Sequence, residues 1–259
     1  MSVENIQSLL IVGGGVEGWM SAAYLARVLG PSVTISLLDQ EPAAAPIGCA
    51  TLPPIKALHA TLGLAEADIL KRSDATMKLG TQFVNWGHLG NRYFHAHGGP
   101  QGGYAPDFDL VPLYQWWLKA RGEGVGVGDF DDYSFGWRLA REGRFVHPDP
   151  DRRLIQSTHD YAYHLDMNLY ADILKKQAIG HGVRVKFGEI LEVRQHHETG
   201  DVEAVVLRDG ENLQADLYLD CSGKLAVLAN AVLMPPLRIG HHSCPMIAPF
   251  ASRARRVLS

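Results

Sequence analysis

The sequence predicts an α/β fold built around a parallel sheet, and three observations predict it. An apolar strand at residues 9–12 turns through glycines into a helix. A second apolar stretch at 33–38 follows that helix, as a neighbouring parallel strand would. Further along, a helical pattern at 166–178 is followed by a strand pattern at 183–187, which is the expected return to the same sheet.

The composition is that of an ordinary globular protein. The 259 residues are 46% hydrophobic and 20% charged, enough for one large or two modest domains. A net charge of −4 gives no reason to expect nucleic acid or an anionic membrane as partner. No leader pattern or membrane-length apolar run is evident, so a cytoplasmic location is expected. The odd set Cys49, Cys221 and Cys244 lacks C-x-x-C spacing and predicts neither a disulfide framework nor a zinc site.

The first glycines have the spacing G-x-G-x-x-G between a strand and a helix. Gly13 suits the tight turn, Gly15 lets a pyrophosphate approach the backbone, and Gly18 lets the helix lie close to the strand. Asp39 ends the second strand about twenty residues later, where an acidic side chain binds a ribose diol. The pattern favours a dinucleotide site, with a ligand-free glycine turn as the alternative.

A Pro/Ala-rich loop at 40–48 leads to helices expected at 51–62 and 65–72. Residues 75–86 then alternate well enough for one continuous strand. Lys78 lies on that strand among large apolar residues. Periodicity alone favours a solvated edge lysine, because sheets use such residues against aggregation.

Residues 87–103 are rich in glycine and histidine. His95 and His97 could be two metal ligands on one side of a strand, but no third ligand supports them, so loop histidines are expected. A helix at 113–119 and a glycine-rich loop at 122–128 follow. Five aromatic residues could line a pocket for a planar substrate or belong to the core, and the core is slightly favoured: Tyr133, Phe135, Trp137, Tyr161 and Tyr163.

The segment 161–178 starts extended and becomes a helix capped by Asp166. Leu165, Leu169, Ile173 and Leu174 form its expected buried stripe. Lys175 and Lys176 lie toward its end, where the helix dipole favours cations. A β-meander follows, with strands expected at 183–187, 189–195, 202–208 and 213–219, and it ends in Asp220-Cys221-Ser222-Gly223.

Taken together, several stretches resemble the flavin-dependent halogenases of the tryptophan halogenase type. The resemblance runs from about residue 8 to 223, and the glycine turn extended by Trp19 and Met20 and the strand with Lys78 are its most specific parts. The matching stretches are residues 13–20, 50–55, 75–80, 83–86, 163–166 and 220–223.

This resemblance implies a Rossmann-like FAD-binding domain of the flavin monooxygenase type, with an added β-meander and a partial substrate domain. The FAD-binding halogenase-like domain would span 1–223, with a substrate-side insertion at about 75–165. Lys78 matches the family's catalytic lysine, and no metal is implied. The implied cofactor-binding residues are Gly13, Gly14, Gly15, Gly18, Asp39, Ala50, Thr51, Ile190, Asp220 and Gly223.

The implied chemistry is halogenation of a small electron-rich aromatic, such as an indole. FAD would arrive as diffusible FADH2 from a separate reductase, with O2 and chloride or bromide as co-substrates. Flavin hydroperoxide would yield hypohalous acid, which Lys78 would hold and aim at one carbon of the ring. Burial would lower the pKa of that lysine and ease haloamine formation.

The chain also departs from the family pattern. It reads Ile47-Gly48-Cys49-Ala50-Thr51 where the family has Gly-x-Gly-Glu-Ala-Thr, and it lacks the W-x-W-x-I-P element and the family's C-terminal part. Residues 224–259 contain five Lys/Arg and no Asp or Glu, which predicts an atypical, poorly ordered basic tail. Two alternatives to an active halogenase follow: a truncated, inactive FAD-binding module, or a flavin-dependent aromatic monooxygenase.

Overall fold

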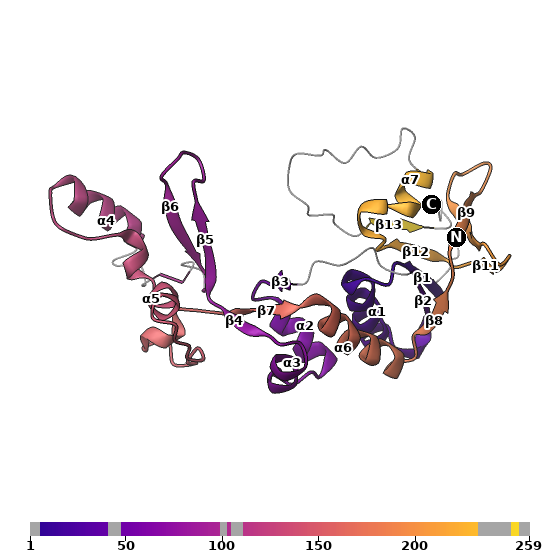
Figure 1. Ribbon diagram of the computed structural model, residues 1–259, viewed down its shortest axis with the longest axis horizontal. Coiled ribbons are helices and arrows are strands. Elements are labelled where there is room, and N and C mark those ends of the chain that lie inside the picture. The colour runs from indigo at the N-terminus through magenta and orange to yellow at the C-terminus, as the bar shows by residue number, and fades with distance from the viewer. Residues whose placement is uncertain (1–5, 41–47, 99–102, 105–110, 233–249, 254–259) are drawn as a thin grey trace. The chain divides into compact units, whose positions relative to one another are not determined.

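The computed structural model describes residues 6–40, 48–98, 103–104, 111–232 and 250–253 (Figure 1). The chain divides into two compact units. Unit 1 consists of residues 1–47, 60–73 and 166–259, and unit 2 of residues 48–59 and 74–165.

Unit 1 is built on a five-stranded sheet in which four neighbouring strands are parallel and one edge strand is antiparallel. The prediction of an α/β fold with a parallel sheet is therefore confirmed. Across the sheet the order is β13 (Phe250–Arg253), β12 (Leu217–Asp220), β1 (Ser8–Val12), β2 (Thr34–Asp39) and β8 (Arg184–Phe187), with β13 antiparallel at the edge. In register, Ile11 of β1 lies between Leu37 of β2 and Leu219 of β12.

Both faces of this sheet are covered, which is why β1 reads as an uninterrupted apolar run. On one face Leu10, Val12 and Leu38 pack into a cluster with Val205 and Leu228. That cluster joins the sheet to α7 (Val227–Val232) and to a three-stranded antiparallel sheet of β9 (Ile190–Gln195), β10 (Val202–Leu207) and β11 (Asn212–Leu213).

The strand predicted at 213–219 is two strands in two sheets. β11 pairs with β10 in the meander, whereas β12 pairs with β1 in the parallel sheet. The strand is interrupted between them because β10 and β1, the two pairing partners, belong to different sheets. Hydrogen bonds between Ser8 and Asp216, of 2.8 and 2.9 Å, hold the start of β12 beside β1.

The helices of unit 1 include α1 (Val16–Leu29), α3 (Glu66–Arg72) and α6 (Met167–Gly180), and α1 packs along α6. Asp166 caps α6 as predicted, since its Oδ1 accepts hydrogen bonds from the backbone N–H groups of Asn168 (2.8 Å) and Leu169 (3.0 Å). The predicted stripe is wrong at Leu169, which is 37% exposed. Tyr170, 1% exposed, takes that place in the core.

Unit 2 contains a small sheet and a hairpin. The sheet has the order β3 (Gly48–Ala50), β7 (Ala162–Asp166) and β4 (Thr76–Lys78), and the hairpin pairs β5 (Gly80–Val84) with β6 (Arg92–Ala96). Two predictions are wrong here. The single strand expected at 75–86 breaks at Leu79, where pairing changes from β7 to β6, and the loop expected at 87–103 contains β6.

The remaining helices are α2 (Ile55–Leu62), α4 (Leu113–Gly122) and α5 (Phe135–Arg141). Two of them, α2 and α4, lie where helices were predicted, and the third, α5, was not predicted. Short 3-10 turns occur at Gly30–Ser32, Phe130–Tyr133, Ile155–Ser157 and Gly223–Leu225.

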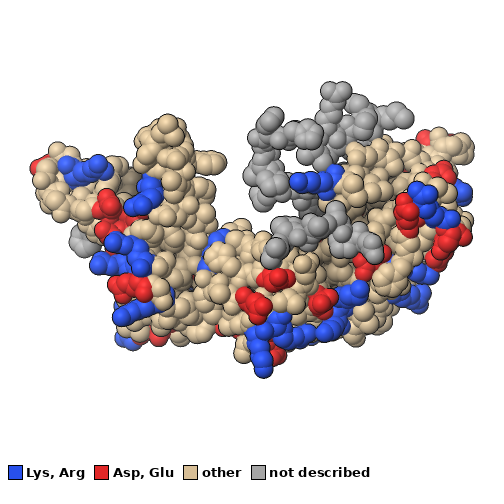
Figure 2. All heavy atoms as spheres, in the orientation of Figure 1, with Lys and Arg blue, Asp and Glu red and all other residues tan. Residues whose placement is uncertain are grey.

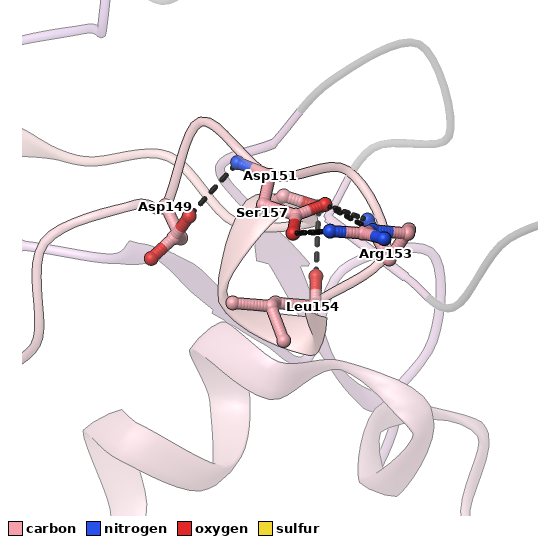
Figure 3. A network of polar contacts seen from close by, with 5 residues as sticks. All are labelled: Asp149, Asp151, Arg153, Leu154 and Ser157. Atoms are coloured by element: carbon pink, nitrogen blue, oxygen red, sulfur yellow. Dashed lines mark hydrogen bonds and ion pairs between the residues drawn. The ribbon is translucent and has the colours of Figure 1, made fainter.

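The connection from α5 to β7 is held by local polar contacts (Figure 3). Asp151 accepts hydrogen bonds from Arg153 Nε (2.9 Å) and Nη2 (2.6 Å), while its own N–H donates to Asp149 Oδ1 (2.8 Å). Ser157 Oγ donates to the carbonyl of Leu154 at 2.8 Å. Because these groups lie within a few residues of one another, the segment orders its own turn ahead of β7.

Acidic and basic side chains are interspersed on the face seen in Figure 2, and the β5–β6 hairpin presents a mainly uncharged surface there. Val84, Trp86 and Leu89 are exposed on that hairpin. Among the described helices, none combines the length and hydropathy needed to cross a membrane. Of the expected basic tail, residues 227–232 form the helix α7, whose Leu228 is buried, and 233–249 and 254–259 lie outside the described residues.

Candidate functional site

At Gly13 and Gly18, two glycines of the turn in unit 1, backbone atoms leave no room for a side chain. A Cβ at Gly13, where φ is +123°, would lie 2.3 Å from the carbonyl oxygen of Cys221. A Cβ at Gly18 would lie 1.9 Å from the carbonyl oxygen of Gly13. Close packing of helix on strand at Gly18 is what the motif predicts, and the crowding at Gly13 comes from the strand-end segment after β12.

Asp39 lies beside this turn, at the end of β2. A Cβ at Gly14 would be 1.6 Å from Asp39 Oδ1, so that carboxylate reaches over the turn. Its Oδ2 accepts a hydrogen bond from Lys175 Nζ at 3.0 Å, and the same ammonium lies 4.9 Å from the ring centre of Trp19. The helix-dipole role predicted for Lys175 is wrong, because the last turn of α6 contains no basic residue and Lys175 pairs with Asp39.

The parallel pairing of β1 and β12 brings Asp220 to the edge of the sheet where β1 enters the glycine turn. Asp220 is buried, and its carboxylate accepts four hydrogen bonds. The donors are Ser222 N (3.0 Å), Ser222 Oγ, Leu228 N (2.8 Å) and Ala229 N (3.0 Å). This carboxylate therefore fixes the start of α7, and Gly223 follows it as an exposed residue with φ +63°.

These residues fit the phosphate and ribose portions of a dinucleotide. Gly15 is the N-cap of α1 and offers no side chain that would occupy the first N–H groups of the helix. Asp39 is placed for a ribose diol, with Lys175 holding it. Ile190 lies apart from the turn and packs against the core cluster under the meander.

Lys78, in unit 2, lies on β4 at the edge of its sheet, but the expectation that it is solvated is wrong. It is 7% exposed, and its Nζ donates a hydrogen bond of 2.9 Å to the carbonyl oxygen of Thr51. Its cross-strand partner is Ala162, whose small side chain leaves room on the sheet face they share. Burial lowers the pKa of Lys78 below 10.5, and the nearby Cys49 opposes this in part.

Thr51 is the residue that fixes the Lys78 acceptor. Its N–H and Oγ1 both donate to the carbonyl of Tyr163, at 2.9 and 3.0 Å, and Oγ1 accepts from Tyr163 N at 3.0 Å. The carbonyl of Thr51 is thus held in place directly after β3, the strand that neighbours β7. Ala50, immediately before it, ends β3 and is exposed.

Lys78 also lines a cavity of about 470 Å³ together with His164, Phe94, Phe145 and Arg144. Register places His164 opposite Thr76, on the sheet face that also carries Lys78. Burial and the Lys78 charge both lower the pKa of His164. The site thus combines a desolvated amine, an imidazole and two aromatic rings, a set suited to orienting a planar molecule.

The sequence pattern did not indicate that His97 is buried close enough to Lys78 for that charge to help lower its pKa. It is 5% exposed, and its N–H donates to the carbonyl of Leu79, next to Lys78, at 2.8 Å. His95, two residues earlier, is exposed, so the two do not form a matched pair. No group of three or more potential metal ligands occurs in the described part of the chain.

The aromatic residues divide between the two roles considered for them. Tyr161 and Tyr163 are buried core residues whose rings meet edge to face at 5.9 Å. Trp137 is half-buried and lines a second cavity of unit 2, of about 660 Å³, with Tyr104, Phe130 and Arg121.

Comparison with protein-family models identifies one family, described as tryptophan halogenase, over residues 8–248. The match extends past Gly223, so the expectation that the resemblance ends there is wrong. KtzQ, a tryptophan 7-halogenase of Kutzneria sp. (strain 744), is 31% identical over 257 residues, covering 91% of this chain and 46% of KtzQ. RebH, a tryptophan 7-halogenase of Lentzea aerocolonigenes, is 31% identical over 90% of this chain and 45% of RebH.

Solved structures agree. Xcc4156, a flavin-dependent halogenase from Xanthomonas campestris, superposes with a TM-score of 0.77 and 36% identity over 88% of this chain and 44% of its own. BrvH, a flavin-dependent halogenase from Brevundimonas sp. BAL3, superposes with a TM-score of 0.74 and is 34% identical. The match covers 84% of this chain and 43% of BrvH. The Rossmann-like FAD-binding fold is therefore confirmed, and the chain spans about half the length of the relatives it matches.

Proposed function

Because the chain belongs to the tryptophan halogenase family, we propose that it forms the FAD-binding and lysine-bearing part of a flavin-dependent halogenase. Its substrate would be a small electron-rich aromatic, such as an indole. Lys78 would direct the halogen to one carbon of the ring. The observation that carries this proposal is the burial of Lys78, whose Nζ is hydrogen-bonded to the Thr51 carbonyl at 2.9 Å.

In this proposal unit 1 binds FAD, delivered as FADH2 by a separate reductase. The flavin would supply the oxidation of chloride or bromide by O2. The glycine turn and the first N–H groups of α1 would hold the diphosphate, and Asp39 would bind the ribose. Ala50, Thr51, Ile190, Asp220 and Gly223 are proposed as further cofactor contacts; at Asp220 the backbone would make the contact, since the carboxylate is occupied by its four donors.

Lys78 would receive the hypohalous acid. A desolvated amine is less protonated than one in water, and a neutral amine can bind hypohalous acid by hydrogen bond or react with it to give a haloamine and water. The Thr51 carbonyl holds the amine in one place, so the halogen would be offered from a fixed point. Phe94 and Phe145 in the adjoining cavity would exclude water from the reagent.

A second candidate is an FAD-binding module without catalytic activity. It is favoured by one observation, that the chain covers only 46% of KtzQ and 45% of RebH. A third, an aromatic monooxygenase, would explain the nucleotide fold and leave the buried lysine unexplained.

One experiment separates these candidates. The purified chain is incubated with FAD, a flavin reductase, NADH, O2, chloride or bromide, and a panel of indoles and phenols, and the products are read by mass spectrometry. We expect halogenated product from the wild type and at least a hundredfold less from Lys78→Ala. Lys176→Ala, an exposed lysine on α6, is the matched control and should retain the product.

The other outcomes are equally distinct. Hydroxylated product that persists in Lys78→Ala would support the monooxygenase. FAD retention without any product would support the binding module and contradict halogenation by this chain.

A further inference from the structure

The larger cavity of unit 2 is separate from the one that contains Lys78. Its volume is about 660 Å³, a size that accommodates a small organic molecule. Among the described residues, none lines both cavities. The two are neighbours, because the Phe94 ring of the Lys78 cavity lies 4.9 Å from the Trp137 ring of the larger one. We call the larger one the arginine cavity, after three residues that line it: Arg92, Arg121 and Arg141.

The aromatic walls of the arginine cavity are held in place by polar contacts and by one another. Trp117 Nε1 donates a hydrogen bond to the carbonyl of Gly128 at 3.2 Å. The Phe130 ring meets the Trp117 ring edge to face at 5.6 Å and stacks on the Tyr104 ring at 4.6 Å, both measured between ring centres. The Tyr104 hydroxyl donates to the carbonyl of Phe94 at 2.8 Å. A flat ligand therefore meets aromatic faces whose positions are already fixed.

The three arginines come from three elements, and two of them have no acidic partner. Arg92 lies on β6, Arg121 on α4 and Arg141 on α5. Arg141 pairs with Asp132 at 3.0 Å, whereas Arg92 and Arg121 form no ion pair with any described residue. The guanidinium of Arg121 lies 4.9 Å from the ring centre of Trp117. A guanidinium stacked on an indole keeps the N–H groups at its edge for a ligand.

Two carboxylates, those of Asp129 and Asp131, also line the arginine cavity. Asp131 is engaged at both oxygens, since Oδ2 accepts from Phe94 N at 3.0 Å and Oδ1 accepts from the Tyr104 hydroxyl at 3.2 Å. Burial raises the pKa of Asp131, so the cavity disfavours negative charge on it. Three guanidinium groups against two carboxylates leave the lining positive at neutral pH, which favours an anionic ligand.

We propose that the arginine cavity binds a small planar aromatic carboxylate, with its ring against Trp117 and Phe130 and its carboxylate on Arg121. Arg92 supplies a second positive charge. The planar guanidinium fork matches the two oxygens of a carboxylate, and the fixed rings match a flat apolar body. Because none of these residues belongs to the proposed halogenation site, either proposal can fail without the other.

The test is calorimetric titration of the purified chain with naphthalene-2-carboxylate and with naphthalene-2-carboxamide, a neutral molecule of the same shape. We expect the carboxylate to bind about tenfold more tightly than the amide, or better, because only the carboxylate forms charge-assisted hydrogen bonds with a guanidinium. Arg121→Gln should abolish this preference, and Arg92→Gln should reduce it by about threefold. Both arginines are exposed, so the variants should fold, which circular dichroism checks.

Two further variants serve as controls. Arg138→Gln removes an exposed arginine of α5 that does not line the cavity, and it should keep the wild-type preference. Lys78→Ala removes the cation of the neighbouring cavity and should keep the preference as well.

Four results would each overturn the inference. They are equal affinities for the carboxylate and the amide, no measurable binding of the carboxylate, an unchanged preference in Arg121→Gln, and loss of the preference in Lys78→Ala. The last result would mean that the carboxylate binds at Lys78 and that the arginine cavity is not its site.

Discussion

The two units hold a partly buried lysine in opposite ways. In unit 1, Lys175 is paired with the carboxylate of Asp39 at 3.0 Å, and their side chains are 33% and 13% exposed. In unit 2, Lys78 is more deeply buried and donates to the carbonyl of Thr51, with no carboxylate partner among the described residues.

Under the proposed function, this difference would separate a lysine with a structural charge from a lysine that reacts. A carboxylate would hold Lys78 protonated, because an opposite charge favours the charged form. A neutral carbonyl positions the amine and still lets burial lower its pKa. Unit 1 thus uses its lysine to fix an acidic side chain, whereas unit 2 holds a lysine with a lowered pKa, as the proposed function requires.

The largest expected effect concerns unit 1, at the glycine turn beside Asp39. Gly18→Ala places a Cβ 1.9 Å from the carbonyl oxygen of Gly13, a backbone atom that cannot move alone. The free energy of unfolding should fall by about 3 kcal/mol, and FAD binding with it. Gly180→Ala, in the same unit with nothing within 4 Å, is the control and should be neutral or slightly stabilising. Urea titration followed by circular dichroism measures both, and equal losses would contradict the crowding.

The second prediction concerns unit 2, where His97 is buried near Lys78. The pKa of His97 is lowered from 6.5 to about 4, so between these values the unfolded chain binds a proton that the folded chain does not. Stability should therefore fall as the pH drops from 6.5 toward 4, by at most about 1.4 kcal/mol per pH unit from this group. His97→Phe and His97→Gln should both show a shallower fall in urea titrations. Slopes equal to that of the wild type would disprove the burial of a neutral ring.

The third prediction exchanges the two lysines for methionine. Lys175→Met leaves Asp39 without its partner and should lower the free energy of unfolding by about 1 kcal/mol at pH 7. Lys78→Met removes a desolvated amine and should raise it by about 1 kcal/mol. The folded pKa of Lys78 lies below 10.5, so the wild type regains stability as the pH rises toward that value. The stability gained by Lys78→Met over the wild type should therefore shrink as the pH rises. Urea titrations that show both variants stabilised, or both destabilised, at pH 7 would contradict the contrast between the two lysines.

The smallest effects compare helix caps. Asp166 accepts two backbone hydrogen bonds at 2.8 and 3.0 Å in unit 1, whereas Ser134 accepts one, from Trp137 N at 3.2 Å, in unit 2. Asp166→Ala should lower the free energy of unfolding by about 1 kcal/mol and Ser134→Ala by about 0.5 kcal/mol. Thermal unfolding of the two variants measures both losses. A larger loss in Ser134→Ala than in Asp166→Ala would contradict the prediction.

Much of unit 1 could be predicted from the sequence, because its signals are local. The glycine spacing, the apolar strand before it and the acidic residue after the second strand each act within a few residues of chain. The break at Leu79 could not be predicted in this way. Residues 75–86 alternate throughout, and only the presence of two different partner strands, β7 and β6, divides them.

The candidate site shows the same limit residue by residue. Lys78 was identified through its resemblance to a family motif, while periodicity favoured a solvated lysine. Its burial depends on Thr51 and Ala162, which lie 27 and 84 residues away in the chain. Lys175 was assigned to the helix dipole because its partner, Asp39, is 136 residues away.

The sequence by itself determined the nucleotide-binding turn, the order of most helices and strands, and the identity of the lysine that the family motif carries. These follow from spacing and from side-chain chemistry along the chain. Only the tertiary structure decided that this lysine is buried against a neutral carbonyl, that Asp39 is held by Lys175, and that burial lowers the pKa of His97. Desolvation and hydrogen bonding depend on groups brought together from distant parts of the chain, and a one-dimensional pattern does not record them.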